Sequence, residues 1–150
     1  MIHVDSVEHM QHFAEKIGTR LKGGEVLELI GDVGAGKTTF VRGLARGMGI
    51  DEQVQSPSFT INRVYDANDG RRLVHYDFYR LDNPGIMADE LREALNDGGT
   101  VVVIEWADAV SDVLPSDRLT IQISTDSETS RVLTVHAGGE NTKKLMEYIV

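Results

Sequence analysis

The sequence predicts an α/β domain whose central sheet is mixed and partly antiparallel. A strand pattern over residues 25–30 runs directly into a glycine-rich segment and then into a helical pattern. Four consecutive apolar residues over 101–104 are typical of a central strand that is covered on both faces. Two further pairs of strand-like segments predict antiparallel hairpins beside these central elements.

The first half of the chain shows helix, strand, loop and helix in that order. Ser6 can cap a helix, and the apolar residues after it recur at spacings of three and four as far as Leu21. The strand over 25–30 follows, and the glycine-rich segment over 31–36 comes directly after it. Helical spacing then returns over 37–48, so we expect the second helix to begin where the glycine-rich segment ends.

The second half alternates hairpins, helices and one buried strand. Two strands over 59–66 and 71–76 are joined by a turn at Asp69-Gly70. The remaining expected elements are a helix over 89–95, a strand over 100–105, an antiparallel pair over 119–124 and 132–136, and a closing helix over 141–150. No repeat or linker interrupts this order, so we expect residues 1–150 to form one domain.

The composition excludes several classes of protein. The chain has 150 residues and no cysteine, which excludes disulfide scaffolds and thiolate metal sites. No apolar run approaches the roughly 20 residues needed to cross a bilayer, and the N-terminus lacks a signal-peptide pattern, so we expect a cytoplasmic location. Because nucleic-acid binding usually needs a basic surface, the net charge of −9 indicates that a partner chain holds any nucleic acid.

The glycine-rich segment carries the strongest functional signal. It reads Gly31-Asp32-Val33-Gly34-Ala35-Gly36-Lys37-Thr38-Thr39 and matches the phosphate-loop pattern of glycine, four residues and Gly-Lys-Thr. Glycines let backbone N–H groups turn inward around a phosphate, and the N-terminus of the following helix adds positive charge. Lys37 would reach the β- and γ-phosphates, and the Thr38 hydroxyl would bind Mg²⁺. The segment is therefore predicted to bind a nucleotide.

Two carboxylates are candidates for the metal and for the attacking water of a triphosphate site. Glu105 ends the apolar strand, and Asp77 follows the strand over 71–76. Glu105 is the stronger candidate because a fully apolar run precedes it, whereas Asp77 could equally be a helix cap or a solvated edge residue. His75 and His136 lie within strands and are expected to be satisfied structural histidines, and no spacing of ligand residues predicts a zinc site.

The residues alone leave three functions open. No Asn/Thr-Lys-x-Asp motif for guanine is present, which favours ATP over GTP. An ATP-driven switch that acts on a partner is the simplest interpretation, because 150 residues leave little chain for an acceptor-binding subdomain. A small-molecule kinase and a non-catalytic nucleotide-sensing module are the alternatives. The clustered pair Arg71-Arg72 is most simply explained as a solvated hairpin tip.

Four blocks of sequence occur in order between residues 31 and 115. They read Gly31-Asp32-Val33-Gly34-Ala35-Gly36-Lys37-Thr38-Thr39-Phe40, Ser56-Pro57-Ser58-Phe59-Thr60, His75-Tyr76-Asp77-Phe78-Tyr79-Arg80-Leu81 and Ile104-Glu105-Trp106-Ala107-Asp108, and Leu114-Pro115 follows them. Together these blocks resemble the TsaE (YjeE) family, bacterial ATPases of tRNA threonylcarbamoyladenosine biosynthesis. A phosphate loop alone is common, but the four blocks in this order are highly specific. Ser58 stands where the family usually has threonine.

This resemblance implies a P-loop NTPase-like three-layer fold with a mixed, partly antiparallel central sheet. It also implies a weak Mg²⁺-dependent ATPase, with ATP and Mg²⁺ as cofactors. In the family the partners are TsaB and TsaD, whose complex transfers threonylcarbamoyl to tRNA, and hydrolysis by TsaE is thought to reset that complex. The acidic charge agrees with a tRNA that is held mainly by the partners.

The resemblance further implies roles for individual residues. Those that would bind the nucleotide phosphates are Gly34, Ala35, Gly36, Lys37, Thr38 and Thr39. Thr38 and Glu105 match the magnesium-associated positions, and Asp77 matches an acidic residue near the metal or the water. Lys37, Asp77 and Glu105 would therefore form the catalytic set.

The same resemblance points to a switch and to one further nucleotide contact. The switch segment, which would sense the γ-phosphate, consists of Ser56, Pro57, Ser58, Phe59 and Thr60. Trp106 would pack beside the site and respond to nucleotide, although a plain core aromatic explains the residue equally well. Arg131 falls near a family arginine that approaches the nucleotide.

Overall fold

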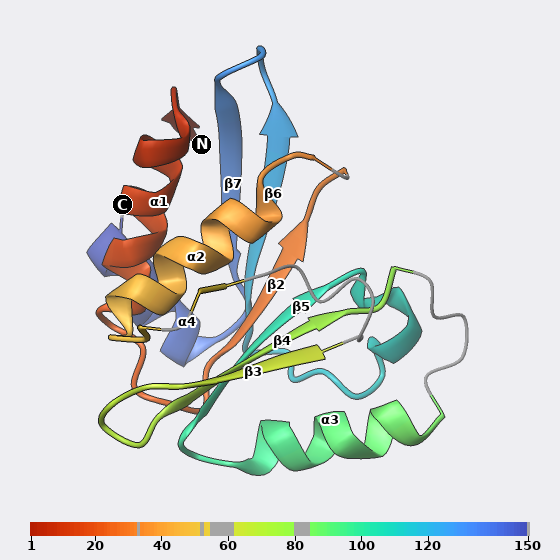
Figure 1. Cartoon of the computed structure of the whole chain (residues 1–150). Helices are drawn as coiled ribbons and strands as arrows, with labels where there is room; N and C mark the ends of the chain where they lie inside the picture. The colour runs from red at the N-terminus through yellow and green to blue at the C-terminus, as the bar shows by residue number, and fades with distance from the viewer. Residues whose placement is uncertain (33, 52, 55–61, 80–84, 150) are drawn as a thin grey trace.

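Within residues 1–32, 34–51, 53–54, 62–79 and 85–149, which the computed structural model describes, a seven-stranded mixed sheet is flanked by four α-helices (Figure 1). The strands are β1 (Ile2–Val4), β2 (Val26–Ile30), β3 (Asn62–Asp66), β4 (Arg72–Asp77), β5 (Thr100–Glu105), β6 (Leu119–Thr125) and β7 (Arg131–Ala137). The helices are α1 (Val7–Gly18), α2 (Lys37–Gly47), α3 (Ile86–Asn96) and α4 (Glu140–Ile149), and η1 (Ala107–Val110) is a short 3₁₀ helix. The expected α/β class with a mixed, partly antiparallel sheet is confirmed.

The sheet has a parallel centre and antiparallel edges. Its order is β1-β7-β6-β2-β5-β4-β3. Strand β2 pairs in parallel with both β6 and β5, and β5 pairs in parallel with β4. Strands β3, β7 and β1 pair antiparallel with their neighbours and so complete the two sides. All four parallel strands therefore point their carboxyl ends toward the same edge of the sheet.

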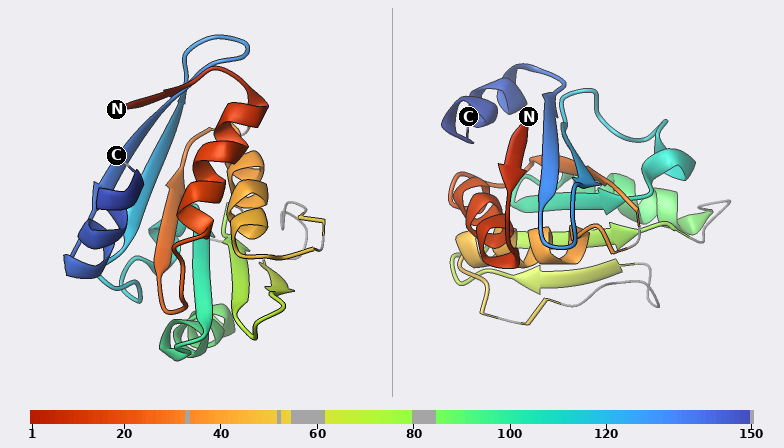
Figure 2. Two further views of the ribbon diagram at one scale, coloured as in Figure 1. Left: turned by 90° about the vertical axis from the view of Figure 1, so that its left-hand side faces the viewer. Right: turned by 90° about the horizontal axis from the view of Figure 1, so that it is seen from above.

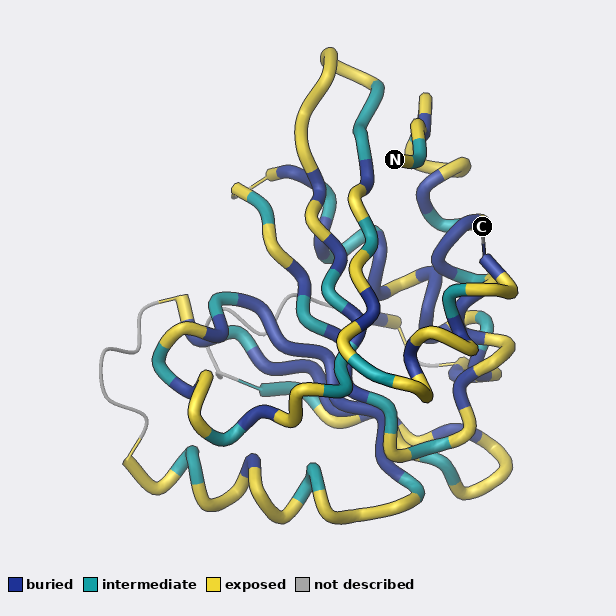
Figure 3. The backbone as a smooth tube through the Cα atoms, turned by 180° about the vertical axis from the view of Figure 1, so that it is seen from behind, coloured by how far each residue is buried: buried dark blue, intermediate teal, exposed yellow. Residues whose placement is uncertain are grey.

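Helices cover both faces of the sheet, as the views in Figures 1 and 2 show. One hydrophobic cluster joins α1, α2 and α4 to the strands, and a second joins α3 and η1 to the opposite face. Strand β5 contributes Val101 and Val103 to the first cluster and Val102 and Ile104 to the second, which confirms that it is covered on both faces. Figure 3 shows the central strands buried and the outer surface of α3 exposed. Among the described residues, no helix is long and apolar enough to cross a membrane.

Helices α1 and α2 approach each other closely because small residues line their contact. A Cβ added to Gly47 would collide with the carbonyl oxygen of Glu15, and one added to Gly43 would collide with that of Gln11. Such close approach brings backbone against backbone and leaves no room for an added methyl group. The two helices are therefore held in fixed positions relative to each other.

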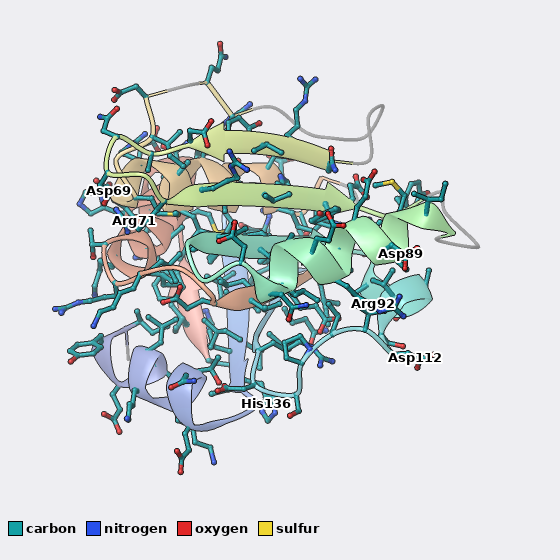
Figure 4. All side chains as sticks on the ribbon, turned by 90° about the horizontal axis from the view of Figure 1, so that it is seen from below. Asp69, Arg71, Asp89, Arg92, Asp112 and His136 are labelled. Atoms are coloured by element: carbon teal, nitrogen blue, oxygen red, sulfur yellow. The ribbon has the colours of Figure 1, made fainter. Side chains whose placement is uncertain are left out.

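At the amino ends of the parallel strands, the Arg71 side chain joins three parts of the fold (Figure 4). Its Nη1 donates to the Leu21 carbonyl after α1, and its Nη2 donates to the Met48 carbonyl at the end of α2, at 3.0 Å. Its Nε donates to Asp69 Oδ2 at 2.8 Å, and this hydrogen bond is the main reason why the pKa of Asp69 is lowered. We call this arrangement the Arg71 clasp. The interpretation of Arg71 as a solvated tip is wrong, whereas the neighbouring Arg72 is half exposed and pairs only with Asp66 among the described residues.

The structure differs from the sequence prediction mainly in short or peripheral elements. Strand β1 was not expected, because three residues at a sheet edge give too short a pattern. Helix α3 begins three residues before the expected start, and β4 begins and ends one residue later than expected, so that it includes Asp77. The short helix η1 was not expected either. Residues 59–61 of the expected first hairpin strand lie outside the described residues.

Candidate functional site

The carboxyl ends of β2, β4 and β5 meet at one edge of the sheet, next to the start of α2 (Figure 1). Glu105, the last residue of β5, is in register with Leu29 of β2 and with Asp77 of β4. Because side chains alternate along a strand, His75 and Asp77 share the sheet face of Val103 and Glu105. That face is the one covered by α1 and α2. The topology therefore places both carboxylates at the edge of the sheet where the glycine-rich segment begins, Glu105 next to β2 and Asp77 one strand further out.

The glycine-rich loop, residues 31–36, connects β2 to α2, and its residue 33 lies outside the described part of the chain. Gly34 and Gly36 have φ values of 85° and 111°, which a side chain would oppose. Gly36 is the N-cap of α2 and offers no side-chain hydrogen bond to the first turn of the helix. The backbone N–H groups of that turn, including those of Thr38 and Thr39, therefore donate no hydrogen bond to a capping side chain at Gly36. Such a loop followed by a helix N-terminus can bind an anion.

Lys37 is buried between the loop and β5. Its Nζ donates to the Gly31 carbonyl at 2.6 Å and lies 3.5 Å from Glu105 Oε1. The same ammonium group lies 4.4 Å from the centroid of the Trp106 ring. The side chain is only 7% exposed, so this positive charge is largely removed from water. A carbonyl, a carboxylate and an aromatic face together compensate it.

Glu105 is held from the other side by a buried histidine. Its Oε2 lies 2.5 Å from His75 Nε2, while its Oε1 faces Lys37. A carboxylate only accepts hydrogen bonds, so His75 Nε2 carries the hydrogen and donates it. The other ring nitrogen, Nδ1, is buried and has no hydrogen-bond partner among the described residues. The expectation of a satisfied structural histidine at this position is therefore wrong.

Asp77, Thr38 and Thr39 are less buried than Lys37 and Glu105. Asp77 Oδ1 accepts the backbone N–H of Tyr79 at 3.0 Å, and the side chain is partly buried. Thr38 and Thr39 are in the first turn of α2 and are also partly buried. All three keep part of their surface open to solvent. His136, in contrast, is exposed on β7, and Figure 4 marks its position.

Trp106 packs both into the core and beside the candidate site. It is half-buried, packs against the α3-side cluster and also contacts the Lys37 ammonium group. Its ring centroid lies 4.8 Å from that of Tyr79. The backbone of Trp106 is left-handed, at φ 57° and ψ 55°, which is rare for a residue with a side chain. This conformation turns the chain sharply after Glu105, and such strain is concentrated at functional sites.

Arg131 lies against the glycine-rich loop, at the start of β7. Its Nε donates to the Ala35 carbonyl at 3.0 Å, and its Nη1 donates to the Ser127 carbonyl at 2.9 Å. A pocket of about 540 Å³ opens here between the loop, the start of α1 and the β6–β7 turn. It is lined in part by Gly34, Thr39 and Arg131. The volume is in the range of small-molecule sites, and it adjoins the mouth of the loop.

A second pocket lies on the other side of the loop. This second pocket measures about 400 Å³ and is lined by Gly31, Trp106 and residues 122–125 of β6, among others.

The predicted switch residues Ser56, Pro57, Ser58, Phe59 and Thr60 lie outside the described residues. Among the described residues, no group of three or more His, Cys, Asp or Glu side chains could hold a metal ion.

Comparisons with known proteins agree with one another over nearly the whole chain. A family model described as "Threonylcarbamoyl adenosine biosynthesis protein TsaE" matches residues 4–133. The tRNA threonylcarbamoyladenosine biosynthesis protein TsaE of Bacillus subtilis is 38% identical over 141 residues, which cover 93% of this chain and 87% of that protein. The protein of the same name from Treponema pallidum is 37% identical over 130 residues, covering 87% and 95%. The crystal structure of Bacillus subtilis YdiB is similar with a TM-score of 0.80 and 34% identity, covering 99% and 91%.

Proposed function

The chain belongs to the TsaE family of tRNA threonylcarbamoyladenosine biosynthesis proteins, and from this membership we propose that it is the ATPase subunit of that system. In this proposal the fold is a P-loop NTPase domain that spans residues 1–150 and acts in the cytoplasm. ATP hydrolysis depends on Mg²⁺ and resets a TsaB–TsaD complex between rounds of threonylcarbamoyl transfer.

The single observation that carries the proposal is the position of the Lys37 ammonium group. It is buried at the mouth of a glycine-rich loop, between the Gly31 carbonyl and the Glu105 carboxylate. A buried ammonium group beside helical N–H groups that have no side-chain cap suits the β- and γ-phosphates of a nucleotide. The adjoining pocket beside Arg131 has room for the rest of an adenine nucleotide.

The donor set at this site fits magnesium. A nucleotide-bound Mg²⁺ needs only one or two oxygen ligands from the protein, because water and phosphate oxygens supply the others. The Thr38 hydroxyl and the Glu105 carboxylate are oxygen donors of this kind at the loop and at the end of β5. When bound, the metal ion neutralises charge that develops on the phosphates.

The residues of the chain divide the remaining work. Lys37 compensates negative charge on the terminal phosphates, and the loop N–H groups hold the phosphates in place. Asp77, at the end of the adjacent strand and partly open to solvent, orients the attacking water. Arg131 holds the loop through its hydrogen bonds to the Ala35 and Ser127 carbonyls, and it binds the nucleotide in the adjoining pocket that it lines.

Reconstitution tests the proposal directly. Phosphate release from Mg·ATP should be slow for the chain alone and should rise when the TsaB–TsaD pair and tRNA are added. Unchanged release in the reconstituted system would contradict the proposed role. Transfer of labelled phosphate to a small molecule from a metabolite extract, in place of phosphate release, would instead indicate a kinase.

A further inference from the structure

His75 uses its two ring nitrogens very unequally. It is fully buried, its Nε2 is 2.5 Å from Glu105 Oε2, and its Nδ1 has no partner among the described residues. A buried polar atom without a hydrogen bond costs about 1–3 kcal/mol. An apolar side chain of similar size would fill the same space without that cost. Packing alone therefore does not account for a histidine at this position.

The backbone makes the contact between His75 and Glu105 rigid. His75 is in register with Val103, two residues before Glu105, and both strands are parallel neighbours in the buried centre of the sheet. The imidazole thus reaches diagonally along the sheet face to the end of β5. Since neither backbone can shift without breaking the ladder, the hydrogen bond from His75 is what holds Oε2 in one place.

Fixing Oε2 leaves the other carboxylate oxygen for a different partner. Oε1 faces the Lys37 ammonium at 3.5 Å, a distance longer than that of a good hydrogen bond. The two oxygens of Glu105 therefore have separate surroundings, one inside the sheet and one at the mouth of the glycine-rich loop. Carboxylates that bind metals are commonly oriented by a hydrogen bond to the other oxygen.

We propose that His75 is a positioning residue for Glu105: its Nε2–H holds Oε2 so that Oε1 is presented to the magnesium ion of a bound nucleotide. This inference rests on the proposed function. It predicts that His75 contributes to the magnesium-dependent part of nucleotide affinity and not to the affinity for ATP without metal.

Three variants of His75 separate this role from packing. In His75→Gln, the amide nitrogen can occupy the place of Nε2 and donate to Glu105. In His75→Asn, the amide nitrogen occupies the place of Nδ1 and falls short of Glu105. His75→Leu fills the space without any donor. The glutamine and asparagine variants have the same chemistry and differ only in reach, so each is the control for the other.

The measurement is calorimetric affinity for ATP in the presence of Mg²⁺ and again in EDTA, with thermal unfolding of the nucleotide-free proteins recorded in parallel. We expect His75→Asn and His75→Leu to lose about 10–100-fold in Mg·ATP affinity, as is typical when a residue supporting a metal ligand is lost. Their affinity for ATP in EDTA should match that of the unaltered chain. His75→Gln should retain most of the magnesium-dependent affinity.

Several outcomes would overturn the inference. Equal losses with and without Mg²⁺ would mean that the variants damage the pocket, and equal behaviour of the glutamine and asparagine variants would mean that reach does not matter. Unaltered Mg·ATP affinity in His75→Leu would show that Glu105 needs no support. If the unaltered chain binds no Mg·ATP, the proposed function itself fails, and that result is distinct from the other three.

Discussion

At the amino ends of the parallel strands, Arg71 is bonded to two carbonyl groups and a carboxylate, whereas at the carboxyl ends Lys37 has one close carbonyl and a more distant carboxylate among the described residues. Both cations are largely removed from water, with side chains 23% and 7% exposed. The two ends of the sheet thus differ in how many close partners compensate a buried positive charge. At the Arg71 clasp, the partners come from residues that close α1, α2 and the hairpin turn.

The difference extends to the groups around each cation. Near Lys37, the Nδ1 of His75 is unpaired among the described residues and Trp106 has a left-handed backbone. Unpaired buried atoms and strained backbone each cost of order 1–3 kcal/mol. The clasp end stabilises the fold, and the loop end keeps polar groups available to a ligand at some cost in stability. Replacing each of the two cations in turn, and measuring both stability and nucleotide affinity, therefore tests this comparison.

The largest effect is expected from Lys37→Met. Two hydrogen bonds to charged phosphates, at about 1.5–3 kcal/mol each, correspond to an affinity loss of roughly 100-fold or more for Mg·ATP in calorimetry. The substitution leaves Glu105 buried without its nearby cation, so stability should fall as well. The double variant Lys37→Met/Glu105→Gln should recover stability but not affinity.

Lys144→Met is the matched control for this prediction. Lys144 is exposed on α4, so its replacement should change neither stability nor affinity. Nucleotide binding by Lys37→Met at the unaltered affinity would remove the distinction between the two ends.

The second effect is the reverse, a loss of stability without loss of binding. In Arg71→Ala the Leu21 and Met48 carbonyls lose a charged donor, and we expect the free energy of unfolding in urea to fall by about 2–3 kcal/mol. Arg72→Ala removes only an exposed ion pair with Asp66 and should cost at most about 1 kcal/mol. Both variants should bind Mg·ATP as the unaltered chain does. Similar losses for the two adjacent arginines would show that the clasp is not a special contact.

The sequence predicted the loop end better than the clasp end, for a physical reason. The glycine-rich loop is a local pattern, because the residues that shape it are consecutive and the strand and helix beside it have their own periodicity. Glu105 and Asp77 could be placed because strand ends are also local features. Their adjacency in register, and the reach of His75 to Glu105, depend on which strands pair in parallel. No local pattern specifies that pairing.

The Arg71 clasp and the close packing of α1 on α2 could not be predicted from local sequence patterns. Arg71 meets carbonyl groups that lie 50 and 23 residues away along the chain. Backbone carbonyls also carry no sequence signature, since every residue has one. The sequence shows that an arginine follows a turn and that glycines interrupt α2, but only the assembled fold shows what each of them contacts.

A third, smaller effect tests the close packing of α1 on α2 near the clasp. Gly47→Ala places a methyl group against the Glu15 carbonyl near the clasp, and overpacking of this kind should cost about 1–3 kcal/mol of stability. Gly98 has no atom within 4 Å of an added Cβ, so Gly98→Ala should be neutral or stabilising by about 0.4–1 kcal/mol. Urea unfolding measures both. A destabilised Gly98→Ala, or a neutral Gly47→Ala, would contradict the packing described for these helices.

The smallest effect concerns the carboxylate of the clasp and appears only in acid. Hydrogen bonding to Arg71 lowers the pKa of Asp69 in the folded chain below its ordinary value of 3.8. A lowered folded-state pKa adds stability above the unfolded value, and this contribution disappears as the pH falls through the folded-state pKa. We therefore expect Asp69→Asn to have a lower urea midpoint than the unaltered chain at pH 6, with the gap narrowing as the pH falls below about 4. In an Arg71→Ala background the gap should be clearly smaller, because the side chain of Arg71 is the main cause of the lowered pKa and only the backbone N–H of residue 71 still donates to Asp69. A gap of unchanged size in that background would show that the Arg71 side chain does not stabilise the ionised Asp69, and would contradict the part of the clasp that joins these two residues.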